Sequence, residues 1–95
     1  MIKKITLNAF SDPSHGWIKV PMALLNQLQI AQKISHYSYK RGEFAYLEED
    51  RDASILMEAM SEQGIKYRIK DNISNKSSNI RSYIPFTQGN LWRQF

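Results

Sequence analysis

The stretch from Ser35 to Glu48, SHYSYKRGEFAYLE, lies in the middle of the 95-residue chain and decides the class of fold. Aromatic and polar residues alternate on both sides of Arg41-Gly42, which is typical of two strands joined by a tight turn. Gly42 can take the positive φ that such a turn requires. A two-residue loop at Arg41-Gly42 places all four rings of the hairpin on one face, with Tyr39 opposite Phe44 and Tyr37 opposite Tyr46.

Two further strands and a helix are predicted on the N-terminal side of this hairpin. Residues 5–10 alternate between apolar and polar positions, as in a half-buried strand. Turn-forming residues follow over Ser11–Gly16, and Trp17–Val20 forms a short second strand. Pro21 suits the first turn of a helix, whose apolar stripe is then Leu24, Leu25 and Leu28.

A second helix and two more strands are predicted on the C-terminal side. The acidic run Glu48–Asp52 suits a helix N-terminus, where carboxylates meet the positive end of the helix dipole, and Gly64 suits its end. The buried stripe of this helix is predicted to be Ile55, Leu56, Ala59 and Met60. Residues 65–70 then alternate as a strand, 71–79 form a polar loop, and 80–84 form a last strand that Pro85 ends.

These elements follow the order β-β-α-β-β-α-β-β. Successive hairpins favour an antiparallel sheet, and two short helices can cover one of its faces. We therefore expect a single two-layer α+β domain over residues 1–85. Residues 86–95 form a tail that is either flexible or docked against the body of the protein.

The composition limits the classes of protein to consider. A hydrophobic content of 42 % is too high for a disordered chain, and 95 residues suffice for one modest core. The absence of cysteine excludes disulfides, thiol nucleophiles and zinc–thiolate sites. No apolar run reaches the length of a membrane span, so we expect a cytoplasmic protein without membrane contact and without a cofactor.

Charge is sorted into three blocks along the chain. Residues 1–42 hold six cations and one acid, residues 43–62 hold seven acids and one cation, and residues 63–95 again hold six cations and one acid. The formal net charge of +4 permits contact with nucleic acid or with an acidic protein. The acidic block either caps and solvates the second helix or offers a docking face to a basic partner.

Three strings, SDPSHGWIKV at 11–20, ISHYSYKRG at 34–42 and YLEEDRD at 46–52, resemble small uncharacterised proteins of bacteriophages, prophages and mobile elements. The resemblance runs from the first strand to about Tyr83 and leaves the tail out. It implies a phage or mobile-element origin, in the cytoplasm of the host cell, and assigns no catalytic residue. Small proteins of such origin often bind a host component, which makes an interaction protein an expectation by analogy.

The first candidate site is the basic strand. Its alternation places three cations on one face, at intervals of about 6.5–7 Å, where they could meet successive phosphates. Two more cations from the following segments, and Lys19 of the second strand, could widen the patch. The predicted nucleic-acid-binding residues are Lys66, Arg68, Lys70, Lys76 and Arg81. The alternative is a solvated face whose cations discourage pairing at a sheet edge.

The rings of the central hairpin are the second candidate. Exposed rings could stack bases, as in proteins that bind single strands. We expect them instead on the core side of the sheet under the helices, because the strands contain few large aliphatic residues.

The loop from Asp12 to Trp17 is the third candidate. Asp12 could orient His15 beside Ser14, but neighbours in sequence seldom meet as nucleophile and base. We expect a turn in which Asp12 and Ser14 bond to the backbone. Only two histidines are present and no metal-ligand spacing occurs, so we predict no metal site and no enzyme. A small metal-independent nuclease using His15, His36 and a lysine is a distant alternative.

The leading hypothesis is a binding protein that contacts nucleic acid or a nucleoprotein. The alternative is a protein–protein inhibitor or modulator of a host factor, of anti-defence type. Its contacts would come from the loop, the hairpin turn and the tail, at His15, Trp17, Lys40, Arg41 and Trp92. The choice between these partners and the oligomeric state, including a homodimer, stay open on the sequence.

Overall fold

The central hairpin forms where the sequence predicts it, with a different register. In the computed structural model, which describes residues 4–86, β3 spans Tyr39–Arg41 and β4 spans Phe44–Glu48. Tyr39 pairs with Tyr46 and Arg41 with Phe44, so the turn is Gly42-Glu43 and the predicted turn at Arg41-Gly42 is wrong. Gly42 occupies the first turn position with φ +61°, the sign that matches the right-handed twist of a hairpin.

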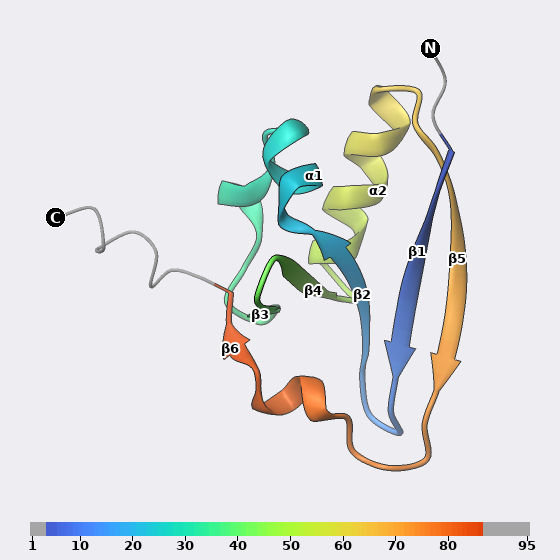
Figure 1. Ribbon diagram of the computed structural model, residues 1–95, viewed down its shortest axis with the longest axis vertical. Coiled ribbons are helices and arrows are strands. Elements are labelled where there is room, and N and C mark those ends of the chain that lie inside the picture. The colour runs from blue at the N-terminus through green and yellow to red at the C-terminus, as the bar shows by residue number, and fades with distance from the viewer. Residues whose placement is uncertain (1–3, 87–95) are drawn as a thin grey trace, which may run out of the picture.

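The elements follow the predicted order and build a single α+β domain. One six-stranded sheet has the strand order β5-β1-β2-β4-β3-β6 (Figure 1). Two α-helices and two short 3-10 helices connect the strands. The bounds are β1 Lys4–Ser11, β2 Gly16–Pro21, α1 Met22–Gln27, η1 Ala31–Lys33, α2 Asp52–Glu62, β5 Lys66–Ile73, η2 Asn79–Ser82 and β6 Ile84–Pro85.

The sheet is mostly antiparallel, but its edge pair β1 and β5 is parallel. The antiparallel sheet that the sequence predicts is thus confirmed for the other pairs, and this one parallel pair arises because α2 carries the chain from β4 across to the far edge beside β1. The pairing runs from Lys4 with Lys66 to Ser11 with Ile73. Asp71 and Asn72 therefore belong to β5, although their polar side chains predicted a loop.

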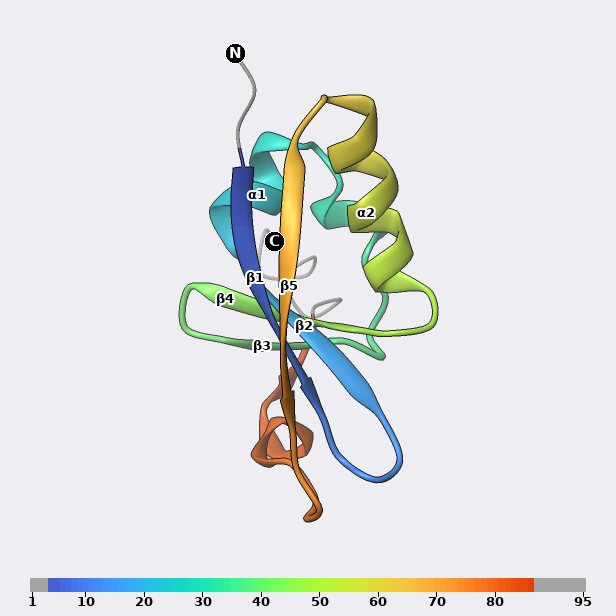
Figure 2. The ribbon, with the colours of Figure 1, turned by 90° about the vertical axis from the view of Figure 1, so that its right-hand side faces the viewer.

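The main core lies between the sheet and the two α-helices. Leu56 and Met60 of α2 and Leu25 of α1 are completely buried, as are Val20 and Leu47 of the sheet. Ile55 and Ala59, which belong to the predicted stripe of α2, are partly buried against the same core. Figure 2 shows both helices at one end of the molecule and the η2 segment at the other, with the direction of β3 and β4 steeply crossed to β1 and β5. The sheet is thus strongly twisted.

The hairpin rings face away from the helices, which corrects the expectation that they fill the main core. Ala45 and Leu47 are completely buried on the helix side, so alternation directs Phe44 and Tyr46 to the opposite side. There Tyr46 joins Trp17 and Ile80 in a second, smaller core. Tyr37 precedes β3 and is 67 % exposed.

The last predicted strand is replaced by η2 and the two-residue β6. Ser78 caps η2, because its hydroxyl accepts the N–H of Ile80 at 3.1 Å, and Ile80 can then enter the second core. Phe86, which the sequence placed in the tail, is buried in the main core. The remaining tail residues, Trp92 among them, lie outside the described residues.

Candidate nucleic-acid interface

The predicted basic strand presents its cations on the side of the sheet that the helices leave uncovered. Lys66, Arg68 and Lys70 of β5 pair in register with Lys4, Thr6 and Asn8 of β1 and share their face. That face is opposite to Leu7, which is buried under the helices. All three predicted cations are exposed, as alternation in the sequence anticipates.

The register brings more cations to the same face from other strands. Lys19 lies opposite Asn8 on β2, and Arg41 lies opposite Phe44 on β3. We use the term basic face for the cations that share this side of the sheet, which are Lys4, Lys19, Arg41, Lys66, Arg68 and Lys70. Lys4 is a residue that sequence reasoning left out. Lys19, which the sequence offered as an extension of the patch, joins the basic face because the strand order places β1 and β2 beside β5.

Carboxylates of the described residues do not neutralise the basic face. Within residues 4–86 the ion pairs are Arg51 with Asp52 and Arg81 with Asp12. Glu48 is the only acid on this side of the described strands, and its oxygens accept backbone N–H groups at the start of α2. The charge of the basic face is therefore available to a ligand.

An exposed ring accompanies these cations. Phe44 is 38 % exposed, and the Nζ of Lys19 lies 4.2 Å from the centre of its ring. The Arg41 guanidinium lies 5.0 Å from the centre of the Tyr83 ring, and its Nη1 donates to the Tyr83 hydroxyl at 3.2 Å. Aromatic and cationic side chains thus meet where the hairpin joins the basic face.

Arg81 has a different place from the one that the sequence suggested. Its Nε and Nη2 donate to the two carboxylate oxygens of Asp12 at 2.7 and 2.9 Å. The hydrogen bonds from Arg81, together with those from the N–H groups of Ser78, His15 and Ser14, hold the pKa of Asp12 well below its usual range. They outweigh burial, which acts in the opposite direction. The same pair raises the pKa of Arg81. Arg81 therefore ties η2 to the loop after β1, and Lys76 lies exposed in the loop before η2.

The loop from Asp12 to Trp17 is built as a turn. The Asp12 carboxylate accepts the backbone N–H groups of Ser14 and His15, at 3.0 and 2.9 Å, and no bond joins it to the His15 ring. The ring of His36 lies beside that of Tyr37, with centres 4.4 Å apart. Within residues 4–86, no three His, Asp or Glu side chains gather as a metal site would require.

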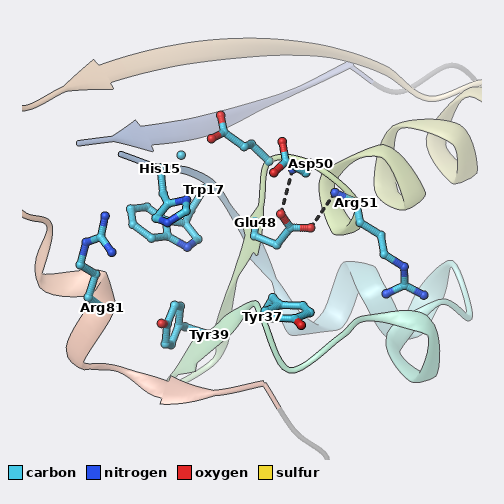
Figure 3. A pocket seen from close by; sticks show the side chains of 10 residues that line it. His15, Trp17, Tyr37, Tyr39, Glu48, Asp50, Arg51 and Arg81 are labelled. Carbon is cyan, nitrogen blue, oxygen red and sulfur yellow. Dashed lines mark hydrogen bonds between the residues drawn. The ribbon is translucent and has the colours of Figure 1, made fainter. Parts of the chain in front are cut away.

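A separate pocket of about 410 Å³ opens beside this loop. Figure 3 shows His15 and Trp17 on one side, Tyr37 and Tyr39 across from them, and Glu48 between. The centres of the Trp17 ring and the Tyr39 ring are 6.3 Å apart, and their planes are steeply inclined. Four further residues complete the lining, together with Gly16: Glu49, Asp50, Arg51 and Arg81.

Buried hydrogen bonds fix the acidic side of this pocket. Ser38 is completely buried, donates to Asp52 Oδ2 at 2.5 Å and accepts the N–H of Glu48 at 2.9 Å. Burial raises the pKa of Glu48, but the N–H groups of Asp52, Arg51 and Asp50 outweigh this effect and leave it below its usual value. The sequence predicted carboxylates at this helix start, yet the part played by Ser38 depends on packing that no local pattern signals.

Comparison with family models, with curated proteins and with solved structures finds no match for this chain. None of the helices formed by residues 4–86 combines the length and the apolar character that a membrane crossing requires.

Proposed function

We propose that this protein binds nucleic acid through the basic face, and that it acts by binding. The observation that carries the proposal is the separation of charge between the two sides of one sheet. Two helices and the main core cover one side, whereas the other presents six cations that no described carboxylate neutralises. Phosphates neutralised by such cations release counterions, which favours association.

The spacing of the cations supports a strand of nucleic acid as the ligand. Alternate residues along β5 place Lys66, Arg68 and Lys70 about 6.5–7 Å apart. This interval is close to the distance between successive phosphates of an extended single strand. Lys19 of β2 and Arg41 of β3 lie on the same side of the sheet and add two more cations to it.

Phe44 supports a single strand rather than a duplex. Its ring is partly exposed between Lys19 and Arg41, and unpaired bases stack on rings in such surroundings. The other rings of the hairpin contribute less to such stacking, because Tyr46 is buried beneath η2.

Fluorescence anisotropy with a labelled single strand of about 15 nucleotides tests the proposal. Each phosphate contact adds about 0.7 to the slope of log K against log salt for single strands, so contacts from three cations give a slope near −2. The double variant Lys66→Ala, Lys70→Ala should reduce that slope by about 1.4. An affinity that is unchanged between about 50 and 300 mM salt excludes the proposal.

The matched control is the double variant Lys33→Ala, Lys40→Ala. It removes the same two charges, but Lys33 lies on η1 and Lys40 pairs with Ala45 on the helix side of the sheet. We expect its slope to stay within about 0.3 of the wild-type slope. Equal losses in the two double variants would show that only net charge matters and would overturn the basic face as the site.

A second candidate function is binding to a host protein, with the modulation of that protein as its consequence. The pocket between His15, Trp17 and Glu48–Asp50 supports it, because its rim is acidic where the basic face is cationic. The phage or mobile-element origin stays a prediction from the three strings. A host protein that co-purifies after nuclease treatment, and is lost on Glu49→Gln with Asp50→Asn but kept on Lys66→Ala with Lys70→Ala, would favour this candidate.

A further inference from the structure

The pocket beside the His15 loop carries uncompensated negative charge. Its two arginines are paired internally, Arg81 with Asp12 and Arg51 with Asp52, and both of these carboxylates are completely inaccessible. The carboxylates of Glu49 and Asp50 are exposed, and within residues 4–86 they accept no hydrogen bond and form no ion pair. Both residues line the acidic side of the pocket, where Figure 3 shows Asp50 beyond Glu48 as seen from Tyr37.

Rings complete the surroundings that a cation favours. Tyr37 is 67 % exposed and lines the pocket with Tyr39, and Trp17 and His15 lie across from them (Figure 3). The π faces of such rings attract a cation within about 6 Å of their centres. A planar guanidinium gains most here, because it can stack on a ring while its N–H groups pair with a carboxylate.

The indole N–H of Trp17 supplies an independent observation. Trp17 is only 3 % exposed, and no residue among 4–86 accepts a hydrogen bond from its N–H. Figure 3 shows the indole nitrogen facing the space between the Trp17 ring, Tyr39 and Glu48. A buried donor without an acceptor is unfavourable, so an occupant with a carbonyl oxygen would satisfy it.

We propose that this pocket binds an arginine side chain of a peptide or protein partner. The guanidinium stacks on Tyr37 and faces the acidic side of the pocket, formed by Glu48, Glu49 and Asp50, and a backbone carbonyl next to that arginine accepts the indole N–H of Trp17. Peptides supply both groups within one residue, whereas a free organic cation supplies only the first. This site is separate from the basic face and does not depend on the proposed contact with nucleic acid.

NMR titration of the ¹⁵N-labelled protein tests the proposal through the indole resonance of Trp17, which Trp92→Phe assigns. The probe is the blocked tripeptide Gly-Arg-Gly, and its neutral control replaces arginine by citrulline, which has the same shape. We expect the arginine peptide to shift the indole resonance and to bind at least about tenfold more tightly than the citrulline peptide. Ethylguanidine, which carries the same single positive charge as the blocked peptide but has no carbonyl, should bind more weakly and leave the indole resonance nearly in place.

Matched variants distinguish an effect of the pocket residues from an effect of the protein's net charge. Glu49→Gln with Asp50→Asn should weaken binding of the arginine peptide about tenfold, whereas Glu58→Gln with Glu62→Gln, which removes two exposed acids of α2, should not change it. Tyr37→Ala should also weaken binding, and its exposure makes the folded state insensitive to the change. Equal affinity for the two peptides, equal losses in the two double variants, or displacement of the peptide by nucleoside monophosphates would each overturn the proposal.

Discussion

Asp12 connects two loops that are far apart in the sequence. Its carboxylate pairs with Arg81 and accepts N–H groups from Ser14, His15 and Ser78, so the folded protein stabilises its charged form. Because its folded pKa lies well below the ordinary value of 3.8, this stabilisation is complete at neutral pH, begins to decline as the pH falls below about 4, and is lost only as the pH falls through the much lower folded pKa. Asp12→Asn should thus destabilise the protein at pH 7, and by a moderately smaller amount near pH 3, where only part of the stabilisation has been lost. Urea unfolding at both pH values measures this, with the exposed Asp71→Asn as control, and a gap that stays constant or widens toward pH 3 would contradict it.

Ser38 is the second residue with a role beyond its size. Its hydroxyl is completely buried between the Asp52 carboxylate and the N–H of Glu48. Ser38→Ala leaves both partners short of a hydrogen bond, and we expect the free energy of unfolding to fall by about 1–3 kcal/mol. Ser61→Ala, at an exposed position of α2 whose hydroxyl makes no hydrogen bond within residues 4–86, should change it by less than about 0.5 kcal/mol. A similar effect of the two substitutions would show that the buried network contributes nothing specific.

Among the elements, α2 is the one in which we expect a cavity to reduce the stability of the protein most. Leu56 is completely buried in the main core, where α2 meets the sheet. Leu56→Ala should lower the free energy of unfolding by about 2–5 kcal/mol, as large-to-small changes in tight cores do. Ile73→Ala is the control, because Ile73 is 81 % exposed at the end of β5 and should change stability by less than about 0.5 kcal/mol. Chemical denaturation would reveal a weakly packed helix if the two variants were equally stable.

The sequence predicts the order of the elements, because its apolar periodicity and turn residues are local signals. The apolar stripe of α2 and the alternation of β5 have the predicted positions, and Gly42 has the predicted positive φ. The pairing of strands is not local. The parallel edge pair and the inclusion of Asp71 in β5 follow from contacts with distant segments, whereas the hairpin turn differs from the prediction by one residue.

At the scale of the whole molecule, the two proposed binding surfaces should act independently. The basic face carries unpaired cations, and the pocket beside His15 carries unpaired carboxylates. We expect Lys66→Ala with Lys70→Ala to leave the affinity for the arginine peptide within about twofold of wild type, as for sites without shared contacts. NMR titration of this double variant measures the effect, and a loss of about tenfold would mean that the two surfaces are coupled.

The candidate site could be predicted only in part, because some of its residues are placed by contacts between segments that are far apart in the sequence. Alternation in the sequence predicts the exposure of Lys66, Arg68 and Lys70, since a strand directs every second side chain to the same face. Lys19 contributes to the basic face because of the strand order. Arg81 does not contribute, because its guanidinium is paired with Asp12, which is 69 positions away in the sequence. Long-range contacts of this kind leave no trace in local periodicity.

The outermost position of β5 has one more consequence. Within residues 4–86 no strand pairs with its far edge, so its backbone could accept a strand from another copy of the protein. Mutual repulsion between rows of like charge opposes such sideways growth. A bound polyanion neutralises these charges and so removes the repulsion that opposes edge-to-edge pairing. Copies bound side by side on one polyanion would therefore polymerise more readily than the same copies in dilute solution.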